Sequence, residues 1–334
     1  LSAKGAKAQV AGFTAKLAMD MGRLTGKTFT YVENDSWESG SQTWSEAFAK
    51  EFHKRRGYDI LPYLPIITGS GVIDSYDVSD RVLWDYRRTI ADLIRYNYHG
   101  QFRKTLNKLG LKYMSEGAGP MQFMLDPLNY QAEADVPMGE FWHATTLYED
   151  NRVSASVAHT YGKKYVGAEA FTGCASWKPA IYELKSLGDR AFCEGSNWFI
   201  FHNFGHKPWL DVVPGITFDV WGWHFDRTNT WWEQSKAYLQ YLNRCQYLLR
   251  EGLFVADICY YIGDDVPNRL GFREDAWLPI PDSYDYDGCN TEILKRFTVK
   301  DGKLTLSHGM TYRVLLLPDS LTIMPDALQK IYEL

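Results

Sequence analysis

The stretch Tyr165-Val-Gly-Ala-Glu169 decides the fold class, because it is a short apolar run that ends on a carboxylate and has a helical pattern on each side. The helical patterns cover residues 154–161 and 179–193. A series of strands that alternate with helices predicts parallel strands joined by right-handed crossovers. Similar strand runs occupy residues 28–32, 112–116, 136–140 and 198–202, and further helical patterns cover residues 6–21 and 80–109.

Polar residues follow these predicted strands at the point where each one ends. Four of the runs lead into a glutamate, and the fifth ends at His202-Asn203. The carboxyl ends of the strands form the active-site rim of a (β/α)8 barrel, and a doubly wound sheet also binds ligands there. We favour the barrel because so many successive strands carry polar ends. The four glutamates are Glu33, Glu116, Glu140 and Glu169.

A second α/β domain is predicted after the barrel. The helical pattern over residues 230–251 ends at Gly252, which is typical of a helix C-cap. Strand runs then follow at residues 255–262, 303–306 and 312–317, and a last helical pattern begins at Pro325. We therefore expect a barrel domain over residues 1–252 and the start of another domain over residues 253–334. Because both ends of the chain lie within helical patterns, we expect it to be a piece of a longer protein.

Composition and missing motifs exclude several function classes. The net charge of −5 argues against nucleic-acid binding, which needs a basic surplus. The sequence contains no run of 18 apolar residues, so no membrane span is predicted. The sequence contains no GxGxxG, GxxxxGK[ST] or GxSxG motif, so nucleotide binding and serine hydrolysis are not indicated. The five cysteines lie far apart in sequence, which favours buried free thiols over a disulfide framework or a zinc site.

Carboxylates on several barrel strands suit glycoside hydrolysis. That reaction needs one protonated acid for the leaving oxygen and one carboxylate that acts as nucleophile or activates water. Aromatic residues make up 15% of the chain, and many stand beside polar residues in predicted loops, as sugar-binding loops require. Each glutamate also has a structural interpretation as a salt-bridged rim residue, and one or two of them have an interpretation as calcium ligands. His202, His206 and His224 are better suited to hydrogen bonds with sugar hydroxyls than to zinc.

The order of several motifs resembles the family 106 glycoside hydrolases, the α-L-rhamnosidases. The resemblance continues through Pro214-Gly-Ile, Trp231-Trp232 and residues 312–318, and so covers essentially the whole chain. No single motif is decisive, but their order is specific. The motifs are Asp35-Ser-Trp-Glu-Ser-Gly40, Phe52-His-Lys-Arg-Arg-Gly-Tyr-Asp59, Asp135-Val-Pro-Met-Gly-Glu-Phe-Trp142, Gly167-Ala-Glu-Ala-Phe171 and Asp189-Arg-Ala-Phe-Cys-Glu-Gly-Ser-Asn197.

This resemblance implies a (β/α)8 TIM barrel followed by a flavodoxin-like domain within a larger enzyme. The chain would supply barrel strands four to eight, with residues 28–32 as the fourth, and the start of the flavodoxin-like domain. The resemblance further implies hydrolysis of terminal α-L-rhamnosyl linkages in plant-type polysaccharides or glycosides, inversion at the anomeric carbon and a calcium ion that helps to hold the sugar. A secreted or periplasmic location is expected on the same ground.

Roles for individual residues follow from the resemblance. Glu38 resembles the general acid, Glu169 the general base, and Glu140 a calcium or sugar ligand. Glu33, Asp35 and Glu116 are reserve candidates for these roles. Predicted substrate-binding residues are Asp35, Trp37, Glu116, Trp142, Trp177, His202 and Asn203, and the aromatic ones among them are equally compatible with core packing.

Two other interpretations remain open. The first is a retaining glycosidase of the β-galactosidase type, which also joins a barrel to a flavodoxin-like domain. That type needs an Asn-Glu pair after strand four, whereas the order here is Glu33-Asn34. The second is a non-catalytic carbohydrate-binding fragment, because a barrel that lacks three strands has open sheet edges.

Overall fold

The computed structural model describes residues 1–117, 126–143, 150–173, 177–178, 180–218, 221–271, 273, 278–320 and 322–334. The chain divides into two compact units, here called the first and the second unit. The first comprises Leu1–Asp135, Ile262–Arg269 and Leu317–Glu333, and the second comprises Val136–Tyr261, Leu270–Leu316 and Leu334. These units are groups of residues in mutual contact, so the predicted domain boundary between residues 252 and 253 stays a prediction.

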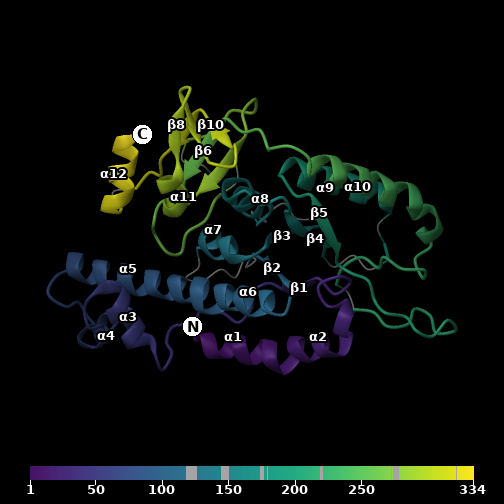
Figure 1. Cartoon of the computed structure of the whole chain (residues 1–334), viewed down its shortest axis with the longest axis horizontal. Helices are drawn as coiled ribbons and strands as arrows, with labels where there is room; N and C mark the ends of the chain where they lie inside the picture. Colours follow the sequence, from purple (N-terminus) through teal and green to yellow (C-terminus); the bar gives the residue numbers. More distant parts are fainter. Residues whose placement is uncertain are drawn as a thin grey trace. The chain divides into compact units, whose positions relative to one another are not determined.

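Two long helical segments dominate the first unit. Helices α1 (Ala3–Gln9) and α2 (Ala15–Met21) are joined by a π-helical turn, and so are α5 (Tyr76–Leu93) and α6 (Gly100–Asn107). Helix α1 packs against α6, and each pair forms a nearly continuous helix (Figure 1). This confirms the helical patterns at residues 6–21 and 80–109. Shorter helices are α3 (Phe48–Arg56) and α4 (Leu64–Ile67), which pack on α5, together with α7 (Pro127–Tyr130) and α12 (Pro325–Glu333).

Strands β1 (Tyr31–Asn34) and β2 (Lys112–Glu116) of the first unit pair in parallel. Strand β2 has the predicted bounds, but β1 begins three residues later than predicted. The backbone amides of Thr28 and Phe29 donate to the carbonyl of Leu24 instead, at 2.9 and 3.2 Å. The start of the predicted strand is therefore part of a turn.

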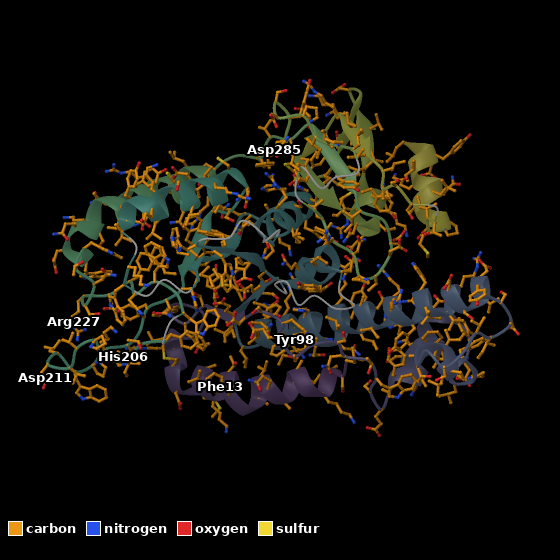
Figure 2. The ribbon with its side chains drawn as sticks, turned by 180° about the vertical axis from the view of Figure 1, so that it is seen from behind. Phe13, Tyr98, His206, Asp211, Arg227 and Asp285 are labelled. Atoms are coloured by element: carbon orange, nitrogen blue, oxygen red, sulfur yellow. The ribbon has the colours of Figure 1, made fainter. Side chains whose placement is uncertain are left out.

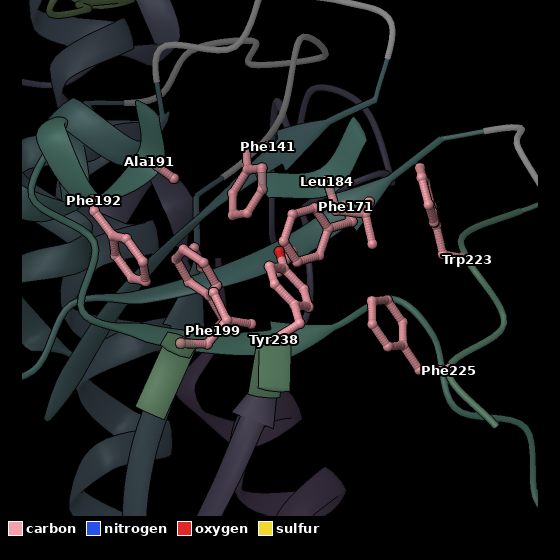
Figure 3. Close-up of a cluster of buried hydrophobic side chains, with 12 residues drawn as sticks. Phe141, Phe171, Leu184, Ala191, Phe192, Phe199, Trp223, Phe225 and Tyr238 are labelled. Atoms are coloured by element: carbon pink, nitrogen blue, oxygen red, sulfur yellow. The ribbon is translucent and has the colours of Figure 1, made fainter. Parts of the chain in front are cut away.

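The second unit contains the other three predicted barrel strands. Strands β3 (Val136–Trp142), β4 (Gly167–Thr172) and β5 (Trp198–Phe201) pair in parallel, in that order. Helices α8 (Asp150–Tyr161), α9 (Ile181–Cys193) and α10 (Lys236–Leu249) belong to the same unit. Residues 168, 170 and 171 of β4 point into an aromatic core with Phe141 and Phe199 (Figure 3). The predicted α/β class with parallel strands is confirmed, whereas the complete barrel and the flavodoxin-like identity of the following domain stay predictions.

Two small sheets complete the second unit. One is parallel, with the order β11 (Val314–Leu316), β6 (Ile258–Tyr261) and β7 (Tyr286–Cys289), and helix α11 (Thr291–Arg296) follows β7. The other is antiparallel, with the order β10 (Thr311–Tyr312), β9 (Lys303–Thr305) and β8 (Thr298–Lys300).

The prediction of one strand over residues 312–317 is wrong. Strand β10 pairs with β9, whereas β11 pairs with β6 in the other sheet. Arg313 lies between β10 and β11, where its amide donates to the carbonyl of Asp257 at 2.7 Å and its guanidinium pairs with the Asp257 carboxylate at 3.2 Å. The chain thus leaves the antiparallel sheet at Arg313 and enters the parallel sheet at Val314.

Helix α8 contacts both β3 and β7. Toward β7, the Gly288 amide donates to the Ser156 hydroxyl at 2.8 Å, and Arg152 donates to the Tyr286 carbonyl at 3.2 Å. His159 pairs with the buried Asp287 at 2.8 Å. Helix α8 thus packs on β3 and is hydrogen-bonded to β7, a strand that lies far from it in the sequence.

Two further predictions concern single features of the chain. Cys193, Cys245, Cys259 and Cys289 are free thiols, as predicted, and Cys259 and Cys289 are also buried as predicted. The predicted burial is wrong for Cys193, which is exposed at the end of α9, and Cys245 is only half-buried. Cys174 lies outside the described residues. Among the helices of the described residues, none combines the length and the apolar character needed to cross a membrane.

Candidate active site

Two predicted carboxylates lie side by side in the second unit. Glu140 on β3 and Glu169 on β4 are direct register partners on neighbouring parallel strands. In-register residues of adjacent strands project from the same face of a sheet, with the strands about 4.8 Å apart. Ala168 and Ala170 point to the opposite face, into the aromatic core. Glu140 is 6% exposed, and the Glu169 side chain 15%. This pair is the centre of the candidate site.

Hydrogen-bond donors orient both carboxylates. The indole N–H of Trp142 donates to Glu140 Oε2 at 2.8 Å, and the hydroxyl of Thr172 donates to Glu169 Oε1. His202 Nδ1 lies 3.8 Å from the same Glu169 oxygen. The hydrogen bonds from Trp142 and Thr172 fix the orientation of the two carboxylates. Four predicted site residues, Glu140, Glu169, Trp142 and His202, are therefore brought together.

A β-bulge places Thr172 in this group. Phe141 pairs with Ala170 but Trp142 pairs with Thr172, so Phe171 is an extra residue on β4, with a φ of 66°. In a regular strand, Thr172 would point away from the face of Glu169. The bulge turns Phe171 into the core (Figure 3) and returns Thr172 to the carboxylate. Strict alternation along a strand assigns Thr172 to the other face, so the sequence pattern did not indicate this residue.

The segment after β5 is held by a second loop. The Asn203 amide donates to the Trp223 carbonyl and the Trp223 amide to the His202 carbonyl, both at 2.9 Å. The Asn203 side chain donates to the Trp221 carbonyl at 3.1 Å. Asn203 was predicted to bind substrate; in the structure its amide nitrogen holds the loop. Gly222 lies within this loop, with a φ of +73°, and a Cβ there would lie 2.6 Å from the His202 carbonyl oxygen.

Gly222→Ala should therefore impair the site more than a glycine substitution elsewhere. The added methyl group must displace His202, and displacements of about 1 Å in an active site lower rates by about 100-fold. Gly252→Ala is the matched control, because Gly252 also has a positive φ of +85° but nothing within 4 Å of the added Cβ. Steady-state kinetics and thermal unfolding of both variants test this. Equal losses in the two variants would contradict the steric argument.

Trp177 was predicted to bind substrate, and in the structure it packs on a buried histidine. Its ring centroid lies 4.0 Å from that of His224, which is fully buried. Burial lowers the pKa of His224, the nearby Lys207 charge lowers it further, and Asp226 opposes the change. His224 is therefore held in its neutral form. Trp177 itself remains 37% exposed, so one part of its ring stays accessible.

The remaining predicted site residues belong to the first unit. Asn34 and Ser115 are register partners, so Asp35 and Glu116 follow at the same end of β1 and β2. Glu116 is buried, whereas Asp35 and Glu38 are exposed. The Ser36 hydroxyl donates to Glu38 Oε1 at 3.1 Å, and the Ser36 amide donates to Asp35 Oδ1 at 2.8 Å.

Trp37 and Glu33 complete the predicted residues of the first unit. The Trp37 indole donates to the Gly40 carbonyl at 2.8 Å, and its ring meets Tyr98 edge to face at 5.2 Å. These contacts stabilise the loop that carries Glu38. Glu33 is exposed and pairs in register with Met114.

Comparisons with known proteins identify the family of the chain. A family model described as alpha-L-rhamnosidase matches residues 1–334. A relative from Formosa agariphila named "Putative beta-glucuronidase" is 40% identical over 319 residues, which cover 94% of this chain and 26% of the relative. The chain thus spans about a quarter of that relative's length.

Solved structures resemble the chain as well. The rhamnosidase from Novosphingobium sp. PP1Y matches with a TM-score of 0.88 and 28% identity, over 100% of this chain and 33% of that protein. A β-galactosidase from the psychrophilic Marinomonas ef1 matches with a TM-score of 0.53 and 12% identity, over 94% of this chain and 56% of that protein. The second likeness concerns the fold alone.

Proposed function

The chain belongs to the α-L-rhamnosidase family of glycoside hydrolases, and from this premise we propose that its protein hydrolyses terminal α-L-rhamnosyl linkages in plant-type polysaccharides or glycosides. The observation that carries the proposal is the family match over the whole chain. The paired carboxylates of β3 and β4, each with a side-chain donor, support it because glycoside hydrolysis depends on oriented carboxyl groups. Secretion or a periplasmic location is part of the proposal, since polysaccharides lie outside the cell.

In the proposed mechanism, Glu169 is the general base. Its carboxylate accepts a proton from the water that attacks the anomeric carbon, while the Thr172 hydroxyl keeps the carboxylate oriented and His202 lies beside it. Glu38 donates a proton to the glycosidic oxygen as the bond breaks. Its exposed position on the loop after β1 suits contact with a leaving group that extends into solvent.

Calcium fits the chemistry of the Glu140 site. The ion prefers carboxylate and other hard oxygen ligands, and β3 and β4 present two carboxylates in register beside the Thr172 hydroxyl. We propose that Glu140 holds the ion, and that Trp142 fixes the orientation of the Glu140 carboxylate. When bound, calcium would supply a positive charge that binds sugar hydroxyls and offsets the repulsion between the two glutamates.

Rhamnose release by the full-length protein tests the proposed function. We expect release from p-nitrophenyl α-L-rhamnoside, loss of most activity in the presence of a chelator, and recovery when calcium is restored. Release that is unaffected by the chelator would contradict the calcium proposal. No release would favour a non-catalytic sugar-binding protein or another sugar, and p-nitrophenyl β-D-glucuronide and β-D-galactoside are the two alternatives to assay in parallel.

The stereochemistry of the first product tests the inverting mechanism separately. Inversion of an α-rhamnoside gives β-rhamnose first, and retention gives α-rhamnose. Proton NMR spectra recorded before mutarotation distinguish the two anomers. Initial formation of α-rhamnose would exclude Glu169 as the base of a single displacement and favour a retaining glycosidase.

Glu38→Gln should affect substrates according to their leaving groups. With methyl α-L-rhamnoside, whose leaving group needs a proton, we expect kcat/KM to fall by about 10²–10⁴-fold. With the p-nitrophenyl glycoside the loss should be much smaller, because p-nitrophenolate leaves without protonation. Glu46→Gln, another exposed glutamate a few residues later, is the control. Equal losses on both substrates would assign Glu38 a role other than general acid.

A further inference from the structure

An exposed aromatic loop follows strand β5. The name refers to residues 204–218 and Trp221. Its aromatic rings are exposed to solvent: Trp221 is 42% exposed, Phe218 60% and Phe204 66%. At its tip, Trp209 is 58% exposed and Leu210 80%. Figure 2 labels His206 and Asp211 on this loop. Because large exposed apolar patches mark interaction or ligand-binding sites, this loop is a candidate binding surface.

Buried contacts hold the loop in its conformation. The Lys207 side chain is 1% exposed, its ammonium group lies 3.4 Å from the Asp226 carboxylate, and it donates to the Ile216 carbonyl at 2.6 Å. Arg227 donates to the carbonyls of Lys207 and Trp209, at 3.0 and 3.1 Å. A buried ion pair thus fixes both sides of the loop. These contacts hold the backbone of the loop at Lys207, Trp209 and Ile216.

The aromatic loop adjoins the paired carboxylates through two ring contacts. Trp221 meets Trp142 edge to face at 6.2 Å, and Trp142 donates to Glu140. Phe218 meets His202 edge to face at 5.8 Å, and His202 lies 3.8 Å from Glu169. Trp221 and Phe218 each contact a side chain that in turn lies next to a carboxylate of the candidate site.

We propose that Phe218 and Trp221 form a binding platform for a second pyranose residue of the same glycan. The inference rests on the proposed function. The apolar C–H face of a pyranose ring stacks on aromatic rings, and ligand sites combine such rings with a few polar groups. Continuity with Glu140 and Glu169 favours a sugar of the same glycan as the occupant, over a separate protein. The platform selects oligosaccharides and polysaccharides over rhamnosides with a small aglycone.

Two substrates separate the platform from the catalytic groups. One is methyl α-L-rhamnoside, and the other is a linear trisaccharide with a terminal α-L-rhamnosyl residue. In the full-length protein, Trp221→Ala and Phe218→Ala should each lower the ratio of kcat/KM for the trisaccharide to kcat/KM for the methyl glycoside by about tenfold or more. Tyr182→Ala, which removes an 88% exposed ring from α9, should leave the ratio unchanged.

Each other outcome contradicts the inference in a distinct way. An unchanged ratio with normal activity would show that the platform binds no sugar, so that a protein partner becomes the occupant to test. Parallel losses on both substrates, with a lowered melting temperature, would assign the rings a structural role. If the unmodified protein releases rhamnose from neither substrate, the proposed function fails, and the platform inference fails with it.

Discussion

Replacement of Glu169 by glutamine should lower kcat/KM for rhamnoside hydrolysis by about 10²–10⁴-fold, the range for removal of a general base. Glutamine keeps the size of the side chain and can still accept the Thr172 hydrogen bond, but it cannot accept a proton from water. The loss should appear with both good and poor leaving groups, since activation of water does not depend on the aglycone. This pattern distinguishes the role of Glu169 from that of Glu38.

Two controls make the Glu169→Gln result specific. Glu251→Gln removes an exposed carboxylate that pairs with Lys164, and should leave the kinetics unchanged. Thr172→Val keeps the Glu169 carboxylate but removes its hydroxyl donor, and should cause a smaller loss than Glu169→Gln. Near-normal activity of Glu169→Gln in a folded protein would transfer the base role to another strand-end carboxylate, and Glu116 would be tested next.

Asp287→Asn should lower the free energy of unfolding more than any of the other proposed substitutions. The Asp287 carboxylate is fully buried, pairs with His159 at 2.8 Å and accepts a hydrogen bond from Tyr312 at 2.9 Å. With His159 protonated, the two side chains form a buried ion pair, and removal of one partner from such a pair lowers the free energy of unfolding by about 3–5 kcal/mol. Denaturant unfolding followed by tryptophan fluorescence measures the loss. Asp257→Asn removes a partly exposed pair with Arg313 and should change stability by about 1 kcal/mol or less.

The Asp287 prediction also has a definite pH dependence. Burial by itself raises the pKa of Asp287, but the charges of His159 and Arg152 and the hydrogen bonds from His159 and Tyr312 outweigh burial and lower the pKa below 3.8. A carboxyl group with a lowered folded-state pKa contributes stability above its unfolded pKa and loses that contribution as the pH falls through the folded value. The difference between wild type and Asp287→Asn should thus be full at neutral pH and should shrink in acid below about pH 4. A difference that stays constant in acid would contradict this assignment.

The sequence predicted the strand ends better than the contacts made there. Glu140 and Glu169 lie where apolar runs give way to polar residues, and this local signal was enough to place both on neighbouring strands. Thr172 could not be predicted, because the bulge at Phe171 depends on packing against Phe141 and Phe199, at 4.9 and 5.9 Å. Such contacts form between different strands, so the alternation of apolar and polar residues along one strand does not reveal them.

Residue types alone also could not decide what each aromatic ring contacts. Trp37 and Trp142 each lie within two residues of a glutamate near the end of a predicted strand. In the structure, however, Trp37 donates to the Gly40 backbone, whereas Trp142 donates to Glu140. The aromatic loop was missed for a related reason. The sequence places aromatic residues such as Phe204 and Phe218 in a predicted loop but does not show that their rings are exposed, which only the structure reveals. The split of the strand predicted over residues 312–317 likewise depends on Asp257, which is distant in sequence from Arg313.

The contacts of helix α8 bear on how the chain responds to a protease. The connection between α10 and β6 is accessible, since Leu253 is 55% and Val255 83% exposed, and it lies at the predicted domain boundary. Helix α8 remains bonded across that connection through Ser156 to Gly288 and through His159 to Asp287. Cleavage there would consequently give two fragments on a denaturing gel that still migrate together under native conditions.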